Sequence, residues 1–129
     1  MTKHRILVID DDRTILSMLE MALTKAEYNV VAARDGRSGL AKFQEDKPDL
    51  VVVDISMPGI DGYQVIEMIR QEDSEKVKQT PIIILTAHDQ AVMRDYAGEL
   101  DVDLYLNKPI LPRNLVAHIK TLLEPNSKS

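Results

Sequence analysis

Residues 50–62 read LVVVDISMPGIDG. The four apolar residues, three of them β-branched valines, are typical of a strand that is buried on both faces. Pro58 and Gly59 indicate a turn directly afterwards, because proline fixes φ and glycine readily takes positive φ. Asp54 therefore lies where a buried strand opens into a loop, the edge at which open α/β sheets bind ligands. The alternative is that Asp54 is only a solvated carboxylate at a strand end.

The composition is that of one globular domain. The chain has 129 residues, of which 44% are hydrophobic and 29% charged, and its net charge is −5. A negative net charge argues against nonspecific nucleic-acid binding, and no apolar run approaches the length of a membrane span. The absence of cysteine excludes disulfides and thiolate metal sites, and it suits a cytoplasmic protein. We expect one domain over residues 1–124 and a polar tail over 125–129.

Four further apolar segments resemble strands, and amphipathic segments separate them. Five strands thus alternate with five helices, and such short connections require parallel strands in a three-layer α/β sandwich. The segment from Gln71 to Thr80 is charged and polar, so an exposed loop is expected there. The predicted strands cover residues 6–9, 30–33, 50–54, 81–86 and 103–106, and the helices include residues 15–23, 36–46, 63–70, 92–100 and 112–122.

The first helix carries an apolar stripe at helical spacing. Ile15, Leu19 and Leu23 are expected to face the core, with Met18 and Ala22 widening the stripe. Asp11 or Asp12 is expected to cap this helix, because a carboxylate there meets free N–H groups and the positive end of the helix dipole.

Polar residues gather at the predicted strand ends. Asp10 and Asp11 follow the first strand, Asp54 ends the third, Thr86 ends the fourth, and Lys108 follows the fifth. Parallel strands place these ends at one edge of the sheet. Carboxylates so close together raise each other's pKa or require a cation. Oxygen ligands without histidine or cysteine favour Mg²⁺, with Mn²⁺ as a second possibility.

Such an edge can support phosphoryl transfer. A carboxylate beside Mg²⁺ can accept a phosphoryl group and form an aspartyl phosphate. Lys108 would neutralise charge on the transferred group, and Thr86 could donate a hydrogen bond to it. The alternatives are that Thr86 is an ordinary β-branched strand residue and that Lys108 is a solvated surface lysine.

From Arg5 to about Leu123 the chain resembles the receiver domain of two-component response regulators. The resemblance implies a flavodoxin-like (βα)₅ sheet of strand order 2-1-3-4-5. The motifs that carry it are the acidic pair Asp10-Asp11, the pattern D-x-x-M-P-x-x-D-G from Asp54 to Gly62, Thr86-Ala87 and Lys108-Pro109.

The resemblance also implies a metal site and a phosphoacceptor. Asp54 would accept the phosphoryl group. Asp11 and Asp54 would bind Mg²⁺ directly, Asp10 through water, and Ser56 through its backbone carbonyl. The donor would be a histidine kinase, a phosphotransfer protein or a small phosphodonor. The protein would be a switch that accelerates only its own phosphotransfer and dephosphorylation, and not a turnover enzyme.

The resemblance further implies how phosphorylation of Asp54 would change other parts of the domain. Lys108 would pair with the phosphoryl group, Thr86 would move toward it, and Tyr105 would turn inward in response. The helix after Thr86, the fifth strand and the last helix would form the output face, toward a downstream protein or an effector domain outside this sequence. A monomer or a phosphorylation-dependent dimer is expected. The alternative for Tyr105 is a half-buried packing residue.

Some positions depart from the family pattern. Glu27 and Asp101 stand near places where receivers usually have glycine in a left-handed conformation, at a cost of up to ~1 kcal/mol each unless the backbone turns differently. His88 could orient or exclude water near an acyl phosphate, or it could be an ordinary loop residue.

Three rival functions are weaker. An aspartate-nucleophile phosphatase commonly has a second aspartate two residues after the nucleophile, where this chain has Ser56. A flavodoxin-like nucleotide-binding module would need a glycine-rich loop after the first strand, which is absent. A receiver that signals without phosphorylation is hard to reconcile with a complete site.

Overall fold

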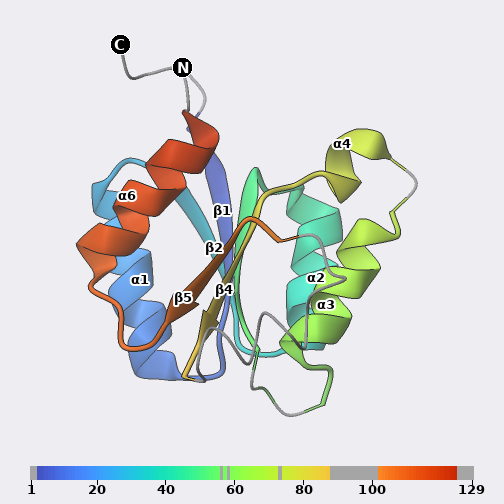
Figure 1. Ribbon diagram of the computed structural model, residues 1–129, viewed down its shortest axis with the longest axis horizontal. Coiled ribbons are helices and arrows are strands. Elements are labelled where there is room, and N and C mark those ends of the chain that lie inside the picture. The colour runs from blue at the N-terminus through green and yellow to red at the C-terminus, as the bar shows by residue number, and fades with distance from the viewer. Residues whose placement is uncertain (1–2, 56, 58, 73, 88–101, 125–129) are drawn as a thin grey trace.

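The computed structural model describes residues 3–55, 57, 59–72, 74–87 and 102–124. In these residues a five-stranded parallel sheet has the order β2-β1-β3-β4-β5, so the predicted strand order is confirmed. Figure 1 shows this sheet between two groups of helices. The helix expected after Thr86 lies outside the described residues. The strands are β1 Arg5–Ile9, β2 Asn29–Ala33, β3 Leu50–Asp54, β4 Ile82–Thr86 and β5 Leu104–Asn107.

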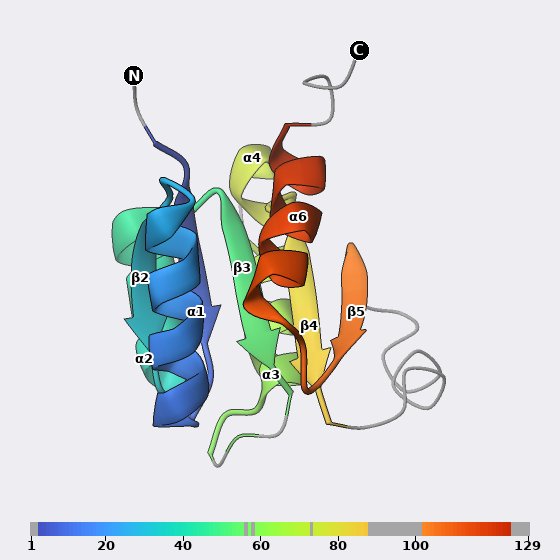
Figure 2. The same cartoon turned by 90° about the vertical axis from the view of Figure 1, so that its left-hand side faces the viewer.

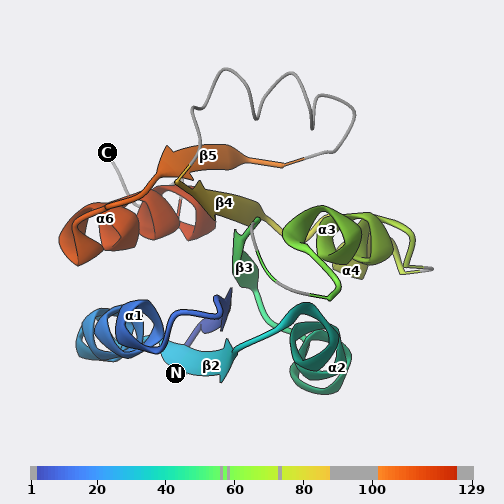
Figure 3. The same ribbon diagram turned by 90° about the horizontal axis from the view of Figure 1, so that it is seen from below.

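Helices cover both faces of the sheet. Figure 3 shows α1 and α6 on one face and α2, α3 and α4 on the other, which gives the expected three layers. The described helices are α1 Arg13–Lys25, α2 Gly36–Asp46, α3 Gly62–Arg70, α4 Glu75–Lys78 and α6 Pro112–Leu123.

The short helix α4 corrects the prediction of a loop from Gln71 to Thr80. Ser74 is its N-cap, and the Ser74 hydroxyl accepts a hydrogen bond from the Val77 N–H at 3.4 Å. This segment is charged and has no apolar stripe, so periodicity could not reveal the helix. A serine followed by Glu75 in the first turn is nevertheless a helix-start signal.

The core has two halves because side chains alternate along each strand. In β1, Leu7 and Ile9 face α2 and α3, whereas Ile6 and Val8 face α1 and α6. All the residues of β3 and β4 are buried, as expected of strands covered on both sides. The edge strand β5 is only partly buried.

The buried side of α1 differs from the predicted stripe. Leu16, Leu19 and Leu23 are buried, whereas Met18 is 46% exposed. The expectation that Met18 widens the stripe is therefore wrong. Leucines spaced three and four residues apart turn the helix so that Met18 lies on its outer side. Asp12 caps α1, because its Oδ1 accepts the Thr14 N–H at 2.9 Å.

In the part of the chain that the structure describes, two non-glycine residues adopt positive φ where helices end. Glu27, which follows α1, has φ 71°, as expected at this position, and Lys47 closes α2 with φ 47°. The corresponding expectation for Asp101 lies outside the described residues. Among the helices given above, none has both the length and the apolar character that crossing a bilayer requires.

Candidate functional site

The strand ends bring the predicted site residues to one edge. The strand arrows in Figure 2 all point toward this edge. Asp54 is the last residue of β3 and Thr86 the last of β4. The Asp10 N–H donates to the Ala33 carbonyl at 3.1 Å, and the Lys108 N–H donates to the Thr86 carbonyl at 2.7 Å. These two hydrogen bonds extend the sheet by one residue on each side. The backbone that carries the Asp10 and Lys108 side chains is therefore held in place.

Three carboxylates form an acidic pocket, by which we mean Asp10, Asp11 and Asp54. One carboxylate oxygen from each of the three residues lies within 4.8 Å of those of the other two. Asp10 is 1% exposed and Asp54 is 5% exposed, whereas Asp11 is exposed. Buried like charges at this distance repel each other in a medium that screens poorly, so the pocket needs a cation.

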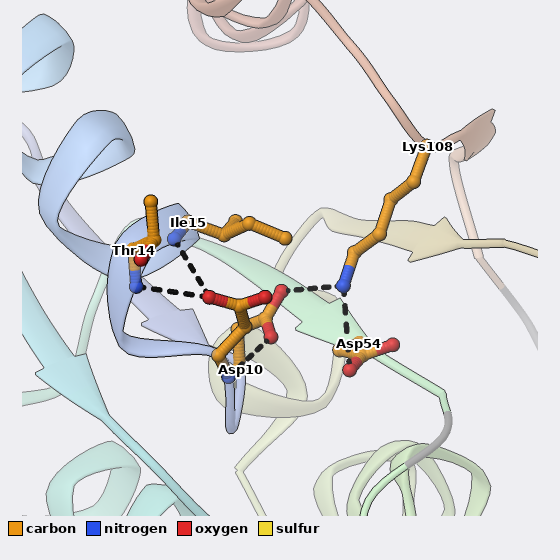
Figure 4. A network of polar contacts seen from close by, with 6 residues as sticks. Asp10, Thr14, Ile15, Asp54 and Lys108 are labelled. Carbon is orange, nitrogen blue, oxygen red and sulfur yellow. Dashed lines mark hydrogen bonds and ion pairs between the residues drawn. The ribbon is translucent and has the colours of Figure 1, made fainter.

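Lys108 supplies one positive charge to the pocket. Its Nζ lies 2.9 Å from Asp10 Oδ2 and 3.5 Å from Asp54 Oδ2 (Figure 4). Burial by itself lowers the pKa of Lys108, but the hydrogen bond with Asp10 and the charges of Asp54 and Asp10 outweigh it, so the pKa lies above its ordinary value. Lys108 is therefore a fixed cation and not a solvated surface lysine.

The acidic segment assigns a different task to each aspartate. Asp10 Oδ1 accepts the Asp12 N–H at 2.9 Å, which turns the chain into α1. Asp12 is the cap of that helix. Asp11 is exposed and contributes to the pocket from its open side. Only Asp10 and Asp11 of this acidic segment therefore belong to the site.

The pocket fits a hard divalent cation. Its donors are carboxylate oxygens, which Mg²⁺ prefers. The buried atom Asp10 Oδ2 lies 2.9 Å from Lys108 Nζ, and no other donor among the described residues reaches it, so a lone pair of this oxygen stays open to a second cation. The expected backbone carbonyl of Ser56 lies outside the described residues.

Hydrogen bonds fix the start of α3 next to the end of β3. Gly62 begins α3 and its N–H donates to the Ile55 carbonyl at 3.2 Å. A capping box joins Asp61 and Gln64 at the start of the helix. Gly59 has φ 78°, as expected from its place in the turn. The sequence of this loop thus fixes where α3 starts relative to Asp54.

Thr86 and Tyr105 lie on the same face of the sheet. Thr86 is fully buried and pairs in register with Asn107, and Tyr105 pairs with Ile84. Residues two apart on a strand share a face, and Tyr105 packs against the half of the core that contains Ile84. Tyr105 is half-buried, so both the switch and the packing interpretations remain compatible with its position. His88 lies outside the described residues.

Sequence patterns did not indicate the ion pair between Lys108 and Asp10 or the one between Arg70 and Asp103. Arg70 Nη2 lies 3.8 Å from Asp103 Oδ1, and Arg70 Nη1 donates to the Thr80 carbonyl at 2.7 Å. Both pairs join residues from distant parts of the chain, so no local spacing reveals them.

Comparison with known proteins gives the same family throughout. Residues 6–120 match the response regulator receiver domain. The chain is 37% identical to the alkaline phosphatase synthesis transcriptional regulatory protein PhoP of Bacillus subtilis, over 92% of this chain and 48% of that protein. It is 39% identical to the transcriptional regulatory protein AfsQ1 of Streptomyces coelicolor, over 92% of this chain and 50% of that protein. The chain thus spans about half the length of these curated relatives.

Solved structures of response regulators also resemble this chain. The chemotaxis response regulator CheY4 of Vibrio cholerae is 29% identical with a TM-score of 0.86, covering 94% of this chain and 99% of that one. A CheY-like receiver domain protein from Methanospirillum hungatei is 27% identical with a TM-score of 0.87, covering 96% of each chain. With the strand order and the acidic pocket, these matches lead to one conclusion: the chain belongs to the response regulator receiver domain family of two-component systems.

Proposed function

We propose that this chain is a phosphorylation-activated signalling switch in which Asp54 accepts a phosphoryl group from a histidine kinase or a phosphotransfer protein. The observation that carries the proposal is a buried carboxylate at a strand end, with Lys108 Nζ 3.5 Å from its Oδ2 and two more carboxylates within 4.8 Å. Asp10 is the poorer acceptor, because its Oδ1 holds the Asp12 N–H and its Oδ2 lies 2.9 Å from Lys108.

In the proposed transfer, one P–O bond forms and one P–N bond breaks. A carboxylate oxygen of Asp54 attacks phosphorus, and the P–N bond of the donor phosphohistidine breaks. The imidazole leaves with the electron pair of that bond and takes a proton from water. The Lys108 ammonium is close enough to Asp54 to offset charge on the phosphoryl oxygens, and the Thr86 hydroxyl would donate to one of them.

The proposed reaction also requires a divalent cation in the acidic pocket. The carboxylates of Asp11 and Asp54 would hold Mg²⁺, or Mn²⁺, with Asp10 acting through water and Ser56 through its carbonyl. When bound, the ion would supply the positive charge that lets two anions approach each other.

Phosphorylation would then shift an equilibrium between two conformations of the domain. Thr86 and Tyr105 are suited to this role because they share one face of the sheet on adjacent strands, two residues apart in the register of β4 and β5. The output face would consist of the predicted helix after Thr86 together with β5 and α6. Its target would be a downstream protein or an effector domain outside this sequence. The second possibility is supported by PhoP and AfsQ1, which are named as transcriptional regulators and are about twice as long as the matched segment.

The same proposal excludes repeated turnover of a separate substrate. The domain would catalyse only its own phosphotransfer and the hydrolysis of its own aspartyl phosphate. Prolonged incubation with a generic phosphate ester checks this, since release of more product than one equivalent of protein would contradict it.

The central experiment is incubation of the chain with Mg²⁺ and acetyl phosphate, followed by intact mass spectrometry. We expect a gain of one phosphoryl group, lost in Asp54→Asn and on chelation of the metal. Asp49→Asn is the matched control, because Asp49 is an exposed aspartate at the opposite end of β3. No gain in the wild type, or an undiminished gain in Asp54→Asn, would contradict the proposal.

A further inference from the structure

Strand β2 is one of the two edges of the sheet, and its own sequence carries none of the usual edge protection. It reads NVVAA over Asn29–Ala33, with neither a charged residue nor a proline. Figure 3 shows β2 at the far end of the sheet from β5, between α1 and α2. An edge strand offers unpaired N–H and C=O groups to an edge strand of another molecule, and proteins commonly block such edges with lysine or proline. Protection of the β2 edge therefore has to come from another element.

Val30 and Ala32 are the residues of β2 whose backbone groups face away from the sheet. In a parallel ladder, successive residues of a strand hydrogen-bond to opposite sides. The Asn29 N–H and the Ala33 carbonyl both hydrogen-bond to the residues that flank β1, at 2.9 Å and 3.1 Å. The backbone groups of Val30 and Ala32, which alternate with them, thus point outward, and no strand of the described residues lies on that side.

Lys42 of α2 reaches this outward side of β2. Its Nζ donates a hydrogen bond to the Ala32 carbonyl at 3.0 Å, in a partly buried position. The contact places a positive charge beside the otherwise uncharged strand. A further strand that added to this edge would have to displace the ammonium from the carbonyl, or enclose it in an interface with too little water to solvate it. Lys42 therefore supplies the protection that the sequence of β2 lacks.

The strand that fits this edge is β2 of a second copy of the chain. A two-fold axis at Val31 would set the two strands antiparallel, with Val30 of one copy opposite Ala32 of the other. The Ala32 carbonyl would then accept the Val30 N–H of the second copy, and this is the oxygen to which Lys42 donates. The symmetry would also bring two Lys42 ammonium groups toward each other, and like charges repel.

We propose that Lys42 blocks the β2 edge: by its hydrogen bond to the Ala32 carbonyl, it prevents two copies of this chain from joining their sheets through β2. The inference goes beyond the proposed switch function and does not depend on it. It bears on assembly, because β5, a part of the proposed output face, forms the opposite edge of the sheet. A chain that could associate through both edges would form open-ended assemblies, and Lys42 would prevent this by closing one of them.

The test is sedimentation velocity over a range of protein concentrations, without a phosphodonor, on the wild type and on Lys42→Met, which keeps the apolar stem and removes the charge. We expect Lys42→Met to dimerise with an association constant roughly a hundredfold above that of the wild type, roughly tenfold for each copy that no longer gives up a hydrogen bond. Lys42→Arg keeps a charged donor and should behave as the wild type does. Lys120→Met, on the exposed side of α6, makes the same change in net charge and is the matched control.

Amide hydrogen exchange identifies the surface through which the variant associates. In Lys42→Met, the N–H groups of Val30 and Ala32 should exchange more slowly as the protein concentration rises, whereas their exchange in the wild type should not depend on concentration. Urea unfolding at low concentration checks that the variant is folded, and Lys42→Gln is a second neutral variant for the same measurements should Lys42→Met be unstable.

Four results would overturn the inference. The neutral variants could remain as monomeric as the wild type, or Lys120→Met could associate to the same extent as Lys42→Met. Lys42→Met could also associate without slower exchange at Val30 and Ala32, which would place the contact on another surface. Finally, a wild type that already dimerises with slowed exchange at these two residues would show that Lys42 does not block the edge.

Discussion

Gly62 lies against the end of β3, where a Cβ atom on it would stand 2.6 Å from the carbonyl oxygen of Asp54. The same atom would stand 2.8 Å from the Cα of Ile55. Both neighbours are backbone atoms of the segment that carries the proposed phosphoacceptor, so neither can move without moving the site. Glycine is required here by space, and it allows α3 to begin directly beside Asp54.

Gly62→Ala should therefore disturb both stability and the site. We expect the free energy of unfolding in urea to fall by about 2 kcal/mol, because overpacking against backbone has no flexible group to absorb it. Labelling of Asp54 by acetyl phosphate should also slow. Gly39→Ala is the matched control: its Cβ would stand 2.5 Å from Cδ1 and 2.9 Å from Cγ1 of the buried Ile9 side chain, so the strain would fall on a side chain and not on the backbone of the site, and alanine favours the helix. Equal losses in the two variants would refute the explanation.

Thr86 should transmit the state of Asp54 through its hydroxyl. Thr86→Ala should leave the phosphoryl gain at Asp54 detectable but reduce the accompanying change at Tyr105, because the two residues share one face of β4 and β5. Thr86→Ser keeps the hydroxyl and should restore the change. NMR of the tyrosine ring, with and without acetyl phosphate, measures it. A full response in Thr86→Ala would remove Thr86 from the proposed switch.

Glu27 holds a left-handed conformation, with φ 71°, that glycine adopts at less cost. Glu27→Gly should raise the free energy of unfolding by up to about 1 kcal/mol, because a side chain is disfavoured at positive φ. The neighbouring Ala26 has φ −83°, so Ala26→Gly should lower stability instead. Urea unfolding of both variants gives the comparison. Destabilisation by both would mean that the Glu27 side chain makes contacts that outweigh its backbone cost.

Asp103 joins the start of β5 to β4 in two ways. Its Oδ1 accepts the Ile82 N–H at 2.9 Å, and it lies 3.8 Å from Arg70 Nη2. Asp103→Asn keeps an acceptor and loses only a partly exposed ion pair, so it should cost about 0.5 kcal/mol or less. Asp103→Ala also leaves the buried Ile82 N–H without that acceptor and should cost about 1–3 kcal/mol. If the two variants lose the same stability in urea, the ion pair and not the hydrogen bond is the important contact.

Tyr28 should make stability depend on alkaline pH. Burial, the nearby charge of Glu124 and the hydrogen bond from the Tyr28 hydroxyl to Glu124 Oε2 at 3.4 Å raise the pKa of Tyr28 to about 12. In the unfolded chain a tyrosine has a pKa near ~10. The folded state therefore holds this proton more tightly, and its contribution to stability is complete below pH ~10 and is lost as pH rises toward 12.

Urea unfolding between neutral pH and pH ~11 measures this effect. The free energy of unfolding of the wild type should fall more steeply above pH ~10 than that of Tyr28→Phe, which has no proton to lose. Glu124→Gln removes one of the causes and should give an intermediate slope. Parallel curves for the wild type and Tyr28→Phe would show that the titration of Tyr28 is not coupled to folding.

The features that local sequence could predict are those with a local cause. The run from Leu50 to Val53 has to be a buried strand, and the polar residue that ends each strand has to lie at one edge of a parallel sheet. Strand order came from the family resemblance, since alternation of strands and helices permits several orders. The partner of Lys108 could not be predicted, because the choice between Asp10 and Asp54 depends on how two distant strand ends pack.

Helix α4 and the outward position of Met18 are two local features that apolar periodicity predicts wrongly. The helix has a capping serine but no apolar periodicity, and Met18 is apolar but lies beside a better set of leucines. Periodicity alone misjudges both, because capping and competition among neighbouring residues decide the outcome.

Asp10 of the acidic pocket follows the first strand, whereas Lys108, its ion-pair partner, follows the last. During synthesis, a nascent chain therefore contains all three carboxylates before the lysine that pairs with Asp10 and Asp54 has left the ribosome. Segments near the N-terminus can begin to fold first. Asp10, however, gains its ion pair with Lys108 only when β5 has been added to the edge of the sheet. If Asp54 is the phosphoacceptor proposed above, a partly synthesised chain would lack the lysine beside it and would accept phosphoryl groups less readily than the finished domain.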